Sequence, residues 1–280
     1  MNTHDRALNP CIRAIVLDMD GTVWLGDQAV PGAADTVAII KARGIPLVFL
    51  TNISAHTRAE LVRRLKRHGI EATEDEVITA SWLMTQQILQ NHGKDSSVVC
   101  VGGGEALRRT LGQAGLVVHD IAEMRKYDDS KSRLIVAVGY TTEFTHEDAK
   151  YLVRVSERVI ACYATDRDRW FADSSGRSPG VGWIVGAVEG ALGHRAISIG
   201  KPERHGLIAI ADRLSLPVST ILMVGDSVDS DVRAAQNTGC LSCLITTHSA
   251  LNKVDPQPNF VINSVTQLIP LLRSYAKTLD

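Results

Sequence analysis

Short apolar runs alternate with amphipathic segments along almost the whole chain. The runs include RAIVLD, IPLVFLTN, SVVCVG, LIVAVGY, RVIACYAT, TILMVGD and LSCLIT. Continuous apolar runs of this length are typical of strands buried on both faces. Because they alternate with helical patterns, we predict an α/β fold with a mostly parallel sheet and helices on both faces.

The segment SAHTRAELVRRLKRHG, residues 54–69, illustrates the helical patterns. Ser54 is expected to cap the start of a helix, Leu61 and Leu65 lie one turn apart, and Gly69 is expected to end it. Its basic residues share the helix with these leucines, so they are interpreted as a solvated face rather than a nucleic-acid site. They are Arg63, Arg64, Lys66 and Arg67.

Charge and composition exclude several classes of partner. The chain has 280 residues, with 30 Lys and Arg against 31 Asp and Glu, a net charge of −1. This balance gives no electrostatic reason to expect nucleic-acid or anionic-membrane binding. No apolar run approaches a membrane span, and none near the N-terminus has signal-peptide character, so a cytoplasmic location is expected. The five cysteines are interpreted as buried thiols in a reducing compartment.

Four of the expected strands end in polar residues. Ligands of open parallel sheets bind outside the carboxyl ends of the strands, so these residues are candidates for one site. A single Asp after a strand is usually a turn or cap residue, and the combination of four such ends carries the prediction. The residues are Asp18 and Asp20, Thr51 and Asn52, Lys201, and Asp226 followed by Asp229 and Asp231.

The chemistry of these residues points to phosphoryl transfer. Asp18 and Asp20 repel each other unless a cation shares their site. Carboxylates without Cys or His ligands suit Mg²⁺, which also neutralises phosphate oxygens. Lys201 would add a positive charge and Thr51 a hydroxyl donor. A carboxylate two residues beyond a nucleophile can act as general acid and then as base.

The same residues carry a family resemblance. The segments DMDGT, TN, GKP and GDSVDSD resemble the four motifs of the haloacid dehalogenase superfamily, in its NagD-like, p-nitrophenylphosphatase-type branch. The resemblance runs from about Ile15 to the last expected helix. It implies a Rossmann-like core of residues 1–79 and 179–280, with an inserted α/β cap domain of residues 80–178 that selects the substrate.

The resemblance also implies a role for each catalytic residue. Asp18 would attack phosphorus to form an aspartyl-phosphate, and Asp20 would protonate the leaving alkoxide and then deprotonate water. Thr51 and Lys201 would hold the phosphoryl oxygens, with Asn52 beside them.

Magnesium is the cofactor that the resemblance implies. Asp18, the main-chain carbonyl of Asp20, and Asp226 would be its ligands. Asp231 would lie behind these ligands or reach the ion through water.

One segment of the expected cap, YATDRDRWFADSSGRSPG, resembles the specificity segment of the branch. Asp166 stands where that branch usually has Asn, and Arg167 would offset its negative charge. Because the segment is the one that selects the substrate in the branch, Asp166 and Arg167 are candidate substrate contacts. The other candidates are Thr51, Asn52 and Lys201. Trp170 and Phe171 are expected in the core of the cap, and the alternative is that one of them stacks on a ring of the substrate.

The function expected from these residues is that of a Mg²⁺-dependent phosphatase. Its substrate would be a small phosphorylated metabolite, such as a nucleoside monophosphate, a sugar phosphate or a phosphoglycolate-like acid. Phosphotransfer or mutase activity remains an alternative, as does a phosphometabolite-binding protein without turnover. Cap-mediated dimers are common in the branch, which leaves a homodimer open.

Overall fold

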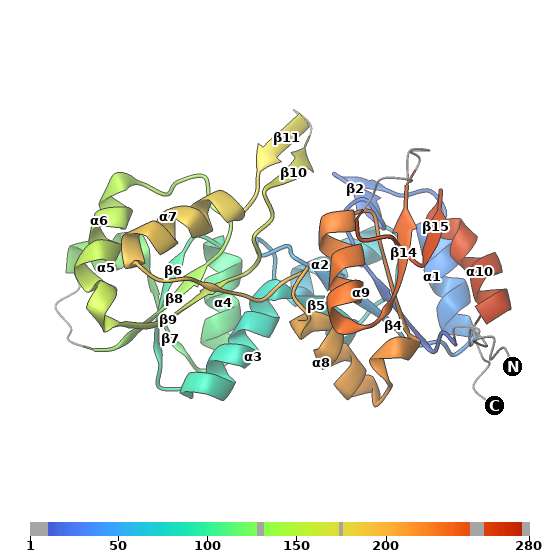
Figure 1. Cartoon of the computed structure of the whole chain (residues 1–280), viewed down its shortest axis with the longest axis horizontal. Coiled ribbons are helices and arrows are strands. Elements are labelled where there is room, and N and C mark those ends of the chain that lie inside the picture. Colours follow the sequence, from blue (N-terminus) through green and yellow to red (C-terminus); the bar gives the residue numbers. More distant parts are fainter. Residues whose placement is uncertain (1–10, 128–131, 174–175, 247–254, 276–280) are drawn as a thin grey trace, which may run out of the picture. The chain divides into compact units, whose positions relative to one another are not determined.

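The computed structural model describes residues 11–127, 132–173, 176–246 and 255–275 (Figure 1). The chain divides into two compact units, one of residues 1–49, 68–70 and 207–280, the other of residues 50–67 and 71–206. The predicted domain limits of 1–79, 80–178 and 179–280 stay a prediction. Among the described residues, no helix has the length and apolar character needed to cross a membrane.

The first unit is built on a parallel sheet. Its strands follow the order β15-β14-β13-β1-β4, and every neighbouring pair in this order is parallel. Strand β1 is buried at every position, as expected for the centre of such a sheet. The strands are β1 (Ala14–Leu17), β4 (Leu47–Thr51), β13 (Ile221–Gly225), β14 (Leu241–Ile245) and β15 (Phe260–Ile262).

Helices and a small hairpin accompany this sheet. The hairpin follows β1 directly and pairs β2 (Trp24–Leu25) with β3 (Gln28–Ala29). The helices are α1 (Ala33–Ala42), α8 (His205–Leu214), α9 (Arg233–Thr238) and α10 (Leu268–Tyr275), and one π-helical turn spans Val228–Val232.

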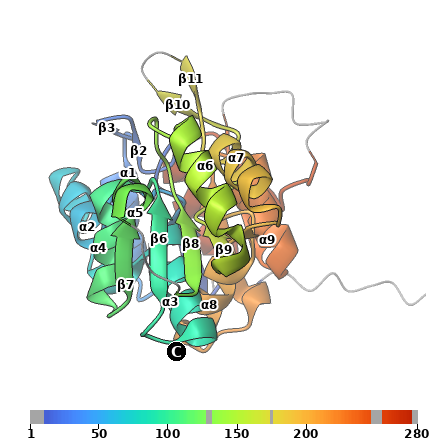
Figure 2. The same cartoon turned by 90° about the vertical axis from the view of Figure 1, so that its left-hand side faces the viewer.

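The second unit has its own parallel sheet, of order β12-β9-β8-β6-β7 (Figure 2). Helices α5, α6 and α7 pack on one face through a continuous apolar core, and α3 and α4 lie on the other face (Figure 1). The strands are β6 (Ser97–Val101), β7 (Val117–Asp120), β8 (Leu134–Val138), β9 (Val159–Ala164) and β12 (Ile197–Ser198). The helices are α2 (Arg58–Arg67), α3 (Ala80–His92), α4 (Gly104–Gln113), α5 (Ile121–Tyr127), α6 (His146–Val155) and α7 (Gly182–Leu192), with short strands β5 (Val77–Thr79), β10 (Trp170–Asp173) and β11 (Gly176–Pro179).

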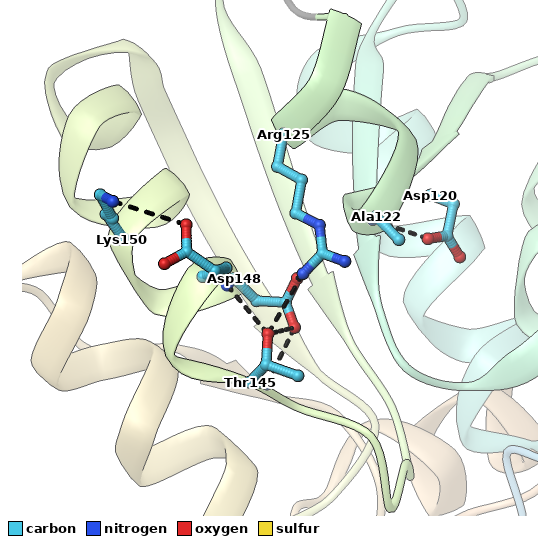
Figure 3. Close-up of polar contacts among 7 residues, drawn as sticks. Asp120, Ala122, Arg125, Thr145, Asp148 and Lys150 are labelled. Carbon is cyan, nitrogen blue, oxygen red and sulfur yellow. Dashed lines mark hydrogen bonds and ion pairs between the residues drawn. The ribbon is translucent and has the colours of Figure 1, made fainter.

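A buried carboxylate ties α5 to the start of α6 (Figure 3). Asp148 is 4 % exposed. It accepts hydrogen bonds from the main-chain N–H and the hydroxyl of Thr145, at 2.9 and 2.7 Å. Arg125 of α5 pairs with the same carboxylate at 2.9 Å. The charge of Asp148 is therefore compensated while it caps α6.

The sheets confirm the α/β prediction, because all seven quoted apolar runs contain strands. The helix predicted from Ser54 begins later, at Arg58. Thr57 and Glu60 form a capping box there, with the Thr57 N–H donating to Glu60 at 2.8 Å. The Ser54 hydroxyl instead accepts a hydrogen bond from the N–H of Tyr140 at 3.3 Å.

The prediction that Trp170 and Phe171 belong to the core of the second unit is wrong. They are 44 % and 40 % exposed on β10, a strand of the β10–β11 hairpin. The Arg177 guanidinium lies 4.2 Å from the centre of the Trp170 ring, and Phe171 meets Tyr140 edge to face at 5.4 Å. Each ring is therefore partly covered by one neighbouring side chain rather than buried in a core.

Candidate active site

Three carboxylates of the first unit converge at the ends of β1 and β13. Oxygens of Asp18, Asp226 and Asp231 all lie within 4.8 Å of one another. Asp18 follows β1 directly, and its N–H donates to Val224 of the adjacent parallel strand at 2.8 Å. Asp18 and Asp231 are buried, at 7 % and 1 % exposure, and Asp226 is exposed. Such a group concentrates negative charge where water screens it poorly, which favours a bound cation.

The turn after β13 holds Asp231 in this cluster. The Ser227 N–H donates to the Asp231 carboxylate at 3.1 Å, and the Asp231 N–H donates back to the Ser227 carbonyl at 2.9 Å. Asp231 lies on the π-helical turn, and these hydrogen bonds direct its carboxylate back toward the end of β13. A bulge of this kind is a common feature of functional sites.

Two glycines allow these carboxylates to approach the main chain. A Cβ atom at Gly21 would lie 2.0 Å from an oxygen of Asp226, and one at Gly225 would lie 2.0 Å from an oxygen of Asp231. Gly21 also has φ of +77°, which other residues rarely adopt. Both glycines lie inside the motifs DMDGT and GDSVDSD, but the local sequence does not indicate that these two positions must lack a side chain.

Asp20 has a different environment from the three converging carboxylates. Its side chain is exposed and accepts a hydrogen bond from the Trp24 indole N–H at 2.7 Å. The Gly21 N–H donates to the Trp24 carbonyl at 2.7 Å, which closes the turn that carries Asp20. The Trp24 indole thus fixes the Asp20 carboxylate two residues from Asp18, but Asp20 is not one of the three converging carboxylates.

In the second unit, the side chain of Asn52 holds the main chain of Lys201. The Lys201 N–H donates to Oδ1 of Asn52 at 2.8 Å, and Nδ2 of Asn52 donates to the Lys201 carbonyl at 2.9 Å. The second proton of Nδ2 is donated to Asp168 at 3.0 Å. Both donors of the amide are used within the protein, so Asn52 positions Lys201. Lys201 itself is 4 % exposed.

Thr51 and Gly200 complete this part of the second unit. Thr51 is 2 % exposed, and its hydroxyl oxygen accepts from the Ile53 N–H at 3.1 Å, a contact that leaves the hydroxyl proton to donate elsewhere. A Cβ atom at Gly200 would lie 2.4 Å from Oδ1 of Asn52 and 2.5 Å from the Thr165 carbonyl. Gly200 is therefore required for the close approach of three chain segments.

Asp166 is a buried carboxylate next to this group, at 2 % exposure. It accepts hydrogen bonds from the Asp168 N–H at 3.0 Å and from the Thr165 hydroxyl at 3.1 Å. Burial raises the pKa of Asp166 to about 7, and the negative charge of Asp168 acts in the same direction. The ammonium of Lys201 opposes the rise.

Arg167 is engaged elsewhere, with Glu189 of α7. Its guanidinium pairs with the Glu189 carboxylate and donates to the Ala196 carbonyl at 3.0 Å. Glu189 also accepts from Arg195 and from the Ala196 N–H, at 3.0 and 2.8 Å. The Arg167 hydrogen bond is the main reason that the pKa of Glu189 falls to about 2. The predicted substrate contact of Arg167 stays a prediction.

The predicted site residues thus form two groups. Asp18, Asp226 and Asp231 converge in the first unit, with Asp20 on the same chain segment as Asp18. Asn52, Lys201 and Asp166 are linked in the second unit through Asp168, and Thr51 adjoins Asn52 in the chain. The first group offers carboxylate oxygens, which fit a hard divalent cation.

Comparisons with known proteins agree on one family. Residues 15–117 match the family described as haloacid dehalogenase-like hydrolase, and residues 198–268 match the one described as HAD-hydrolase-like. The chain is 30 % identical over 272 residues to acid sugar phosphatase of Staphylococcus haemolyticus, covering 95 % of this chain and 98 % of that protein. It is 30 % identical to human chronophin, covering 91 % and 92 %. The crystal structure of 4-nitrophenylphosphatase from Thermotoga maritima superposes with a TM-score of 0.81 at 26 % identity, covering 92 % and 97 %.

Proposed function

The chain belongs to the haloacid dehalogenase-like hydrolases, and we propose that within this family it is a Mg²⁺-dependent phosphatase of small phosphomonoesters. The observation that carries the proposal is the convergence of Asp18, Asp226 and Asp231 within 4.8 Å. It is supported by the named phosphatases among the relatives and structural neighbours.

Asp18, Asp226 and the main-chain carbonyl of Asp20 would hold the ion, with Asp231 behind them. The fit rests on oxygen donors alone and on two glycines that leave no room for a Cβ atom beside Asp226 and Asp231. When bound, Mg²⁺ supplies positive charge that neutralises phosphoryl oxygens and lowers the repulsion between Asp18 and its anionic substrate.

Asp18 and Asp20 divide the chemistry between them. A carboxylate oxygen of Asp18 attacks phosphorus, the ester P–O bond breaks, and Asp20 gives its proton to the departing alkoxide. Asp20 then takes a proton from water as that water attacks phosphorus, and the bond from phosphorus to Asp18 breaks. Phosphate leaves, and both carboxylates return to their starting states. The indole N–H of Trp24 fixes the Asp20 carboxylate through both steps.

Thr51 and Lys201 serve the same phosphoryl group in this proposal. The Thr51 hydroxyl donates a hydrogen bond to a phosphoryl oxygen, and the Lys201 ammonium holds the phosphoryl group through its negative charge. Asn52 keeps Lys201 in position through its two main-chain hydrogen bonds.

Sugar phosphates are the first substrates to screen. The name of the Staphylococcus haemolyticus relative supports this class, and nucleoside monophosphates and phosphoglycolate-like acids follow.

The test is phosphate release from p-nitrophenyl phosphate and a panel of sugar phosphates, each with Mg²⁺ and with EDTA. Wild type is compared with Asp18→Asn and with Asp35→Asn, a matched change at an exposed position of α1 in the same unit. We expect Mg²⁺-dependent release in wild type and Asp35→Asn, and at least a ~10³-fold loss in Asp18→Asn.

Three results would count against the proposal. Release that persists in Asp18→Asn would remove Asp18 as nucleophile. Binding of a phosphate ester without turnover, seen by titration calorimetry, would make the chain a binding protein. Rearranged ester without free phosphate, seen by phosphorus NMR, would make it a mutase.

A further inference from the structure

A continuous chain of hydrogen bonds connects Asp166 to Lys201 within the second unit. The Asp168 N–H donates to Asp166 at 3.0 Å, the Asp168 carboxylate accepts from Asn52 at 3.0 Å, and Asn52 holds both main-chain polar groups of Lys201. Asp166 and Asp168 follow the end of β9, and Lys201 follows β12, the strand that pairs with β9. Gly200 also donates its N–H to the Thr165 carbonyl at 2.7 Å. The segments that carry Asp166 and Lys201 are therefore tied together twice.

Asp166 is the most enclosed ionisable side chain of this network. Its oxygens receive the Asp168 N–H and the Thr165 hydroxyl, and its exposure is 2 %. The charged groups that act on it are Asp168, which disfavours ionisation, and Lys201, which favours it. Because burial disfavours the negative charge of Asp166, and because Asp168 offsets the effect of Lys201, Asp166 binds a proton more readily than an ordinary Asp.

We propose that Asp166 is a positioning residue whose protonation state sets how strongly Lys201 binds the phosphoryl group of the substrate. The inference rests on the proposed phosphatase function. With its proton, Asp166 donates to the Thr165 hydroxyl and still accepts from the Asp168 N–H, so no hydrogen bond of the network is lost. Without its proton, Asp166 adds a second negative charge beside Asp168 and competes with the substrate for the ammonium of Lys201.

The direction of the pH effect follows from these charges. Burial raises the pKa of Asp166 to about 7, so the proton leaves as the solution passes from mildly acidic to mildly alkaline. The substrate is then held less strongly, and KM rises while kcat changes less, because the groups that break and form bonds are elsewhere. Activity thus becomes a function of pH near neutrality through a residue that does not touch the reacting atoms.

The test compares kcat and KM for phosphate release at pH 6.0 and 8.5, and between, in wild type and Asp166→Asn. The amide of Asp166→Asn keeps both hydrogen bonds and cannot ionise, so it imitates the protonated state. We expect KM of wild type to rise at least ~5-fold more than KM of Asp166→Asn over this range. Asp120→Asn is the matched control, because Asp120 pairs with Arg108 in the same unit outside this network.

A second variant keeps the proposal testable if Asp166→Asn folds poorly. Asp168→Asn removes the negative charge that raises the pKa of Asp166 and retains an oxygen for Asn52. Its KM transition is expected at lower pH than in wild type. Coincident profiles of wild type and Asp166→Asn, or a transition in Asp168→Asn that stays in place or moves to higher pH, would overturn the inference. An inactive wild type would instead refute the proposed function.

The pH dependence of folding stability tests the inference about Asp166 without any enzyme assay, and so independently of the proposed phosphatase function. Because the folded pKa of Asp166 lies above the ordinary value of 3.8, its ionisation opposes folding increasingly as pH rises from about 4 to 7. Asp166→Asn should therefore be more stable relative to wild type at pH 8 than at pH 5 in urea unfolding. If the difference in free energy of unfolding between Asp166→Asn and wild type did not change with pH, Asp166 would not bind a proton in the folded protein over this range.

Discussion

Replacing Gly21 by Ala tests the geometry of the carboxylate cluster without removing a charge. The new Cβ atom would lie 2.0 Å from an oxygen of Asp226, and contacts of this kind below 3.0 Å are essentially never seen. The Asp226 carboxylate must therefore retreat by about 1 Å. Metal–oxygen bonds tolerate changes of only about 0.2 Å, so this retreat would remove Asp226 from the ligands of the proposed magnesium ion.

Gly26, in the turn between β2 and β3, supplies a matched control. Its φ is +55°, and a Cβ atom there would meet nothing within 4 Å. Both substitutions carry the cost of a left-handed conformation, about 1–2 kcal/mol of the free energy of unfolding. Their difference in metal binding then reports the contact with Asp226 alone.

Magnesium stabilisation measures that difference. At a Mg²⁺ concentration 100 times the wild-type Kd, bound ion stabilises wild type and Gly26→Ala by about 2.7 kcal/mol. Loss of one ligand should weaken binding by at least ~100-fold, which leaves Gly21→Ala about 0.4 kcal/mol of stabilisation at the same concentration. Urea unfolding with and without Mg²⁺ gives these values, and equal stabilisation of the two variants would refute the reasoning.

Three further substitutions test other contacts. Asp148→Ala leaves the Arg125 guanidinium without this carboxylate and removes the side-chain half of the capping box at the start of α6. Urea unfolding should show a loss of about 2–4 kcal/mol, whereas a loss below 1 kcal/mol would contradict the buried pairing. The stabilisation from the low pKa of Glu189, about 2 against 4.5, is fully present above pH 4.5 and declines as pH falls toward 2, so thermal unfolding of Glu189→Gln should depend less on pH in that window than wild type. An equally steep dependence would mean that folding does not lower the pKa of Glu189. Gly200→Ala should raise KM for phosphate esters at least ~10-fold with magnesium affinity unchanged, since its Cβ atom would lie 2.4 Å from the Asn52 amide that holds Lys201, the proposed phosphate ligand. A normal KM would argue against that role of Lys201.

The sequence predicts the sheets better than it predicts the ends of helices. Continuous apolar runs identify the strands because a strand of a parallel sheet is buried on both faces, so most of its side chains are apolar. Ser54 and Thr57 are both good capping residues, and the choice between them depends on the N–H of Tyr140, which contacts Ser54 from 86 positions away. A contact at that separation cannot be read from local pattern.

The site shows the same limit. Asp18 and Asp226 were identified because each follows an apolar run, and the topology of parallel strands brings such ends together. The part played by Gly21 depends on where the Asp226 side chain comes to lie, and that is a tertiary fact. Phe171 was misplaced because an apolar aromatic pair fits a core and an exposed hairpin equally well in sequence.

The glycines that touch the two groups of site residues have a consequence for mutational tolerance. Every other encoded amino acid brings a Cβ atom, so at Gly21, Gly200 and Gly225 every missense change meets a functional side chain or its support. A saturation scan scored by loss of activity would therefore rank these positions with the carboxylates, although they contribute no chemical group. These three glycines therefore matter because they leave room for the neighbouring side chains.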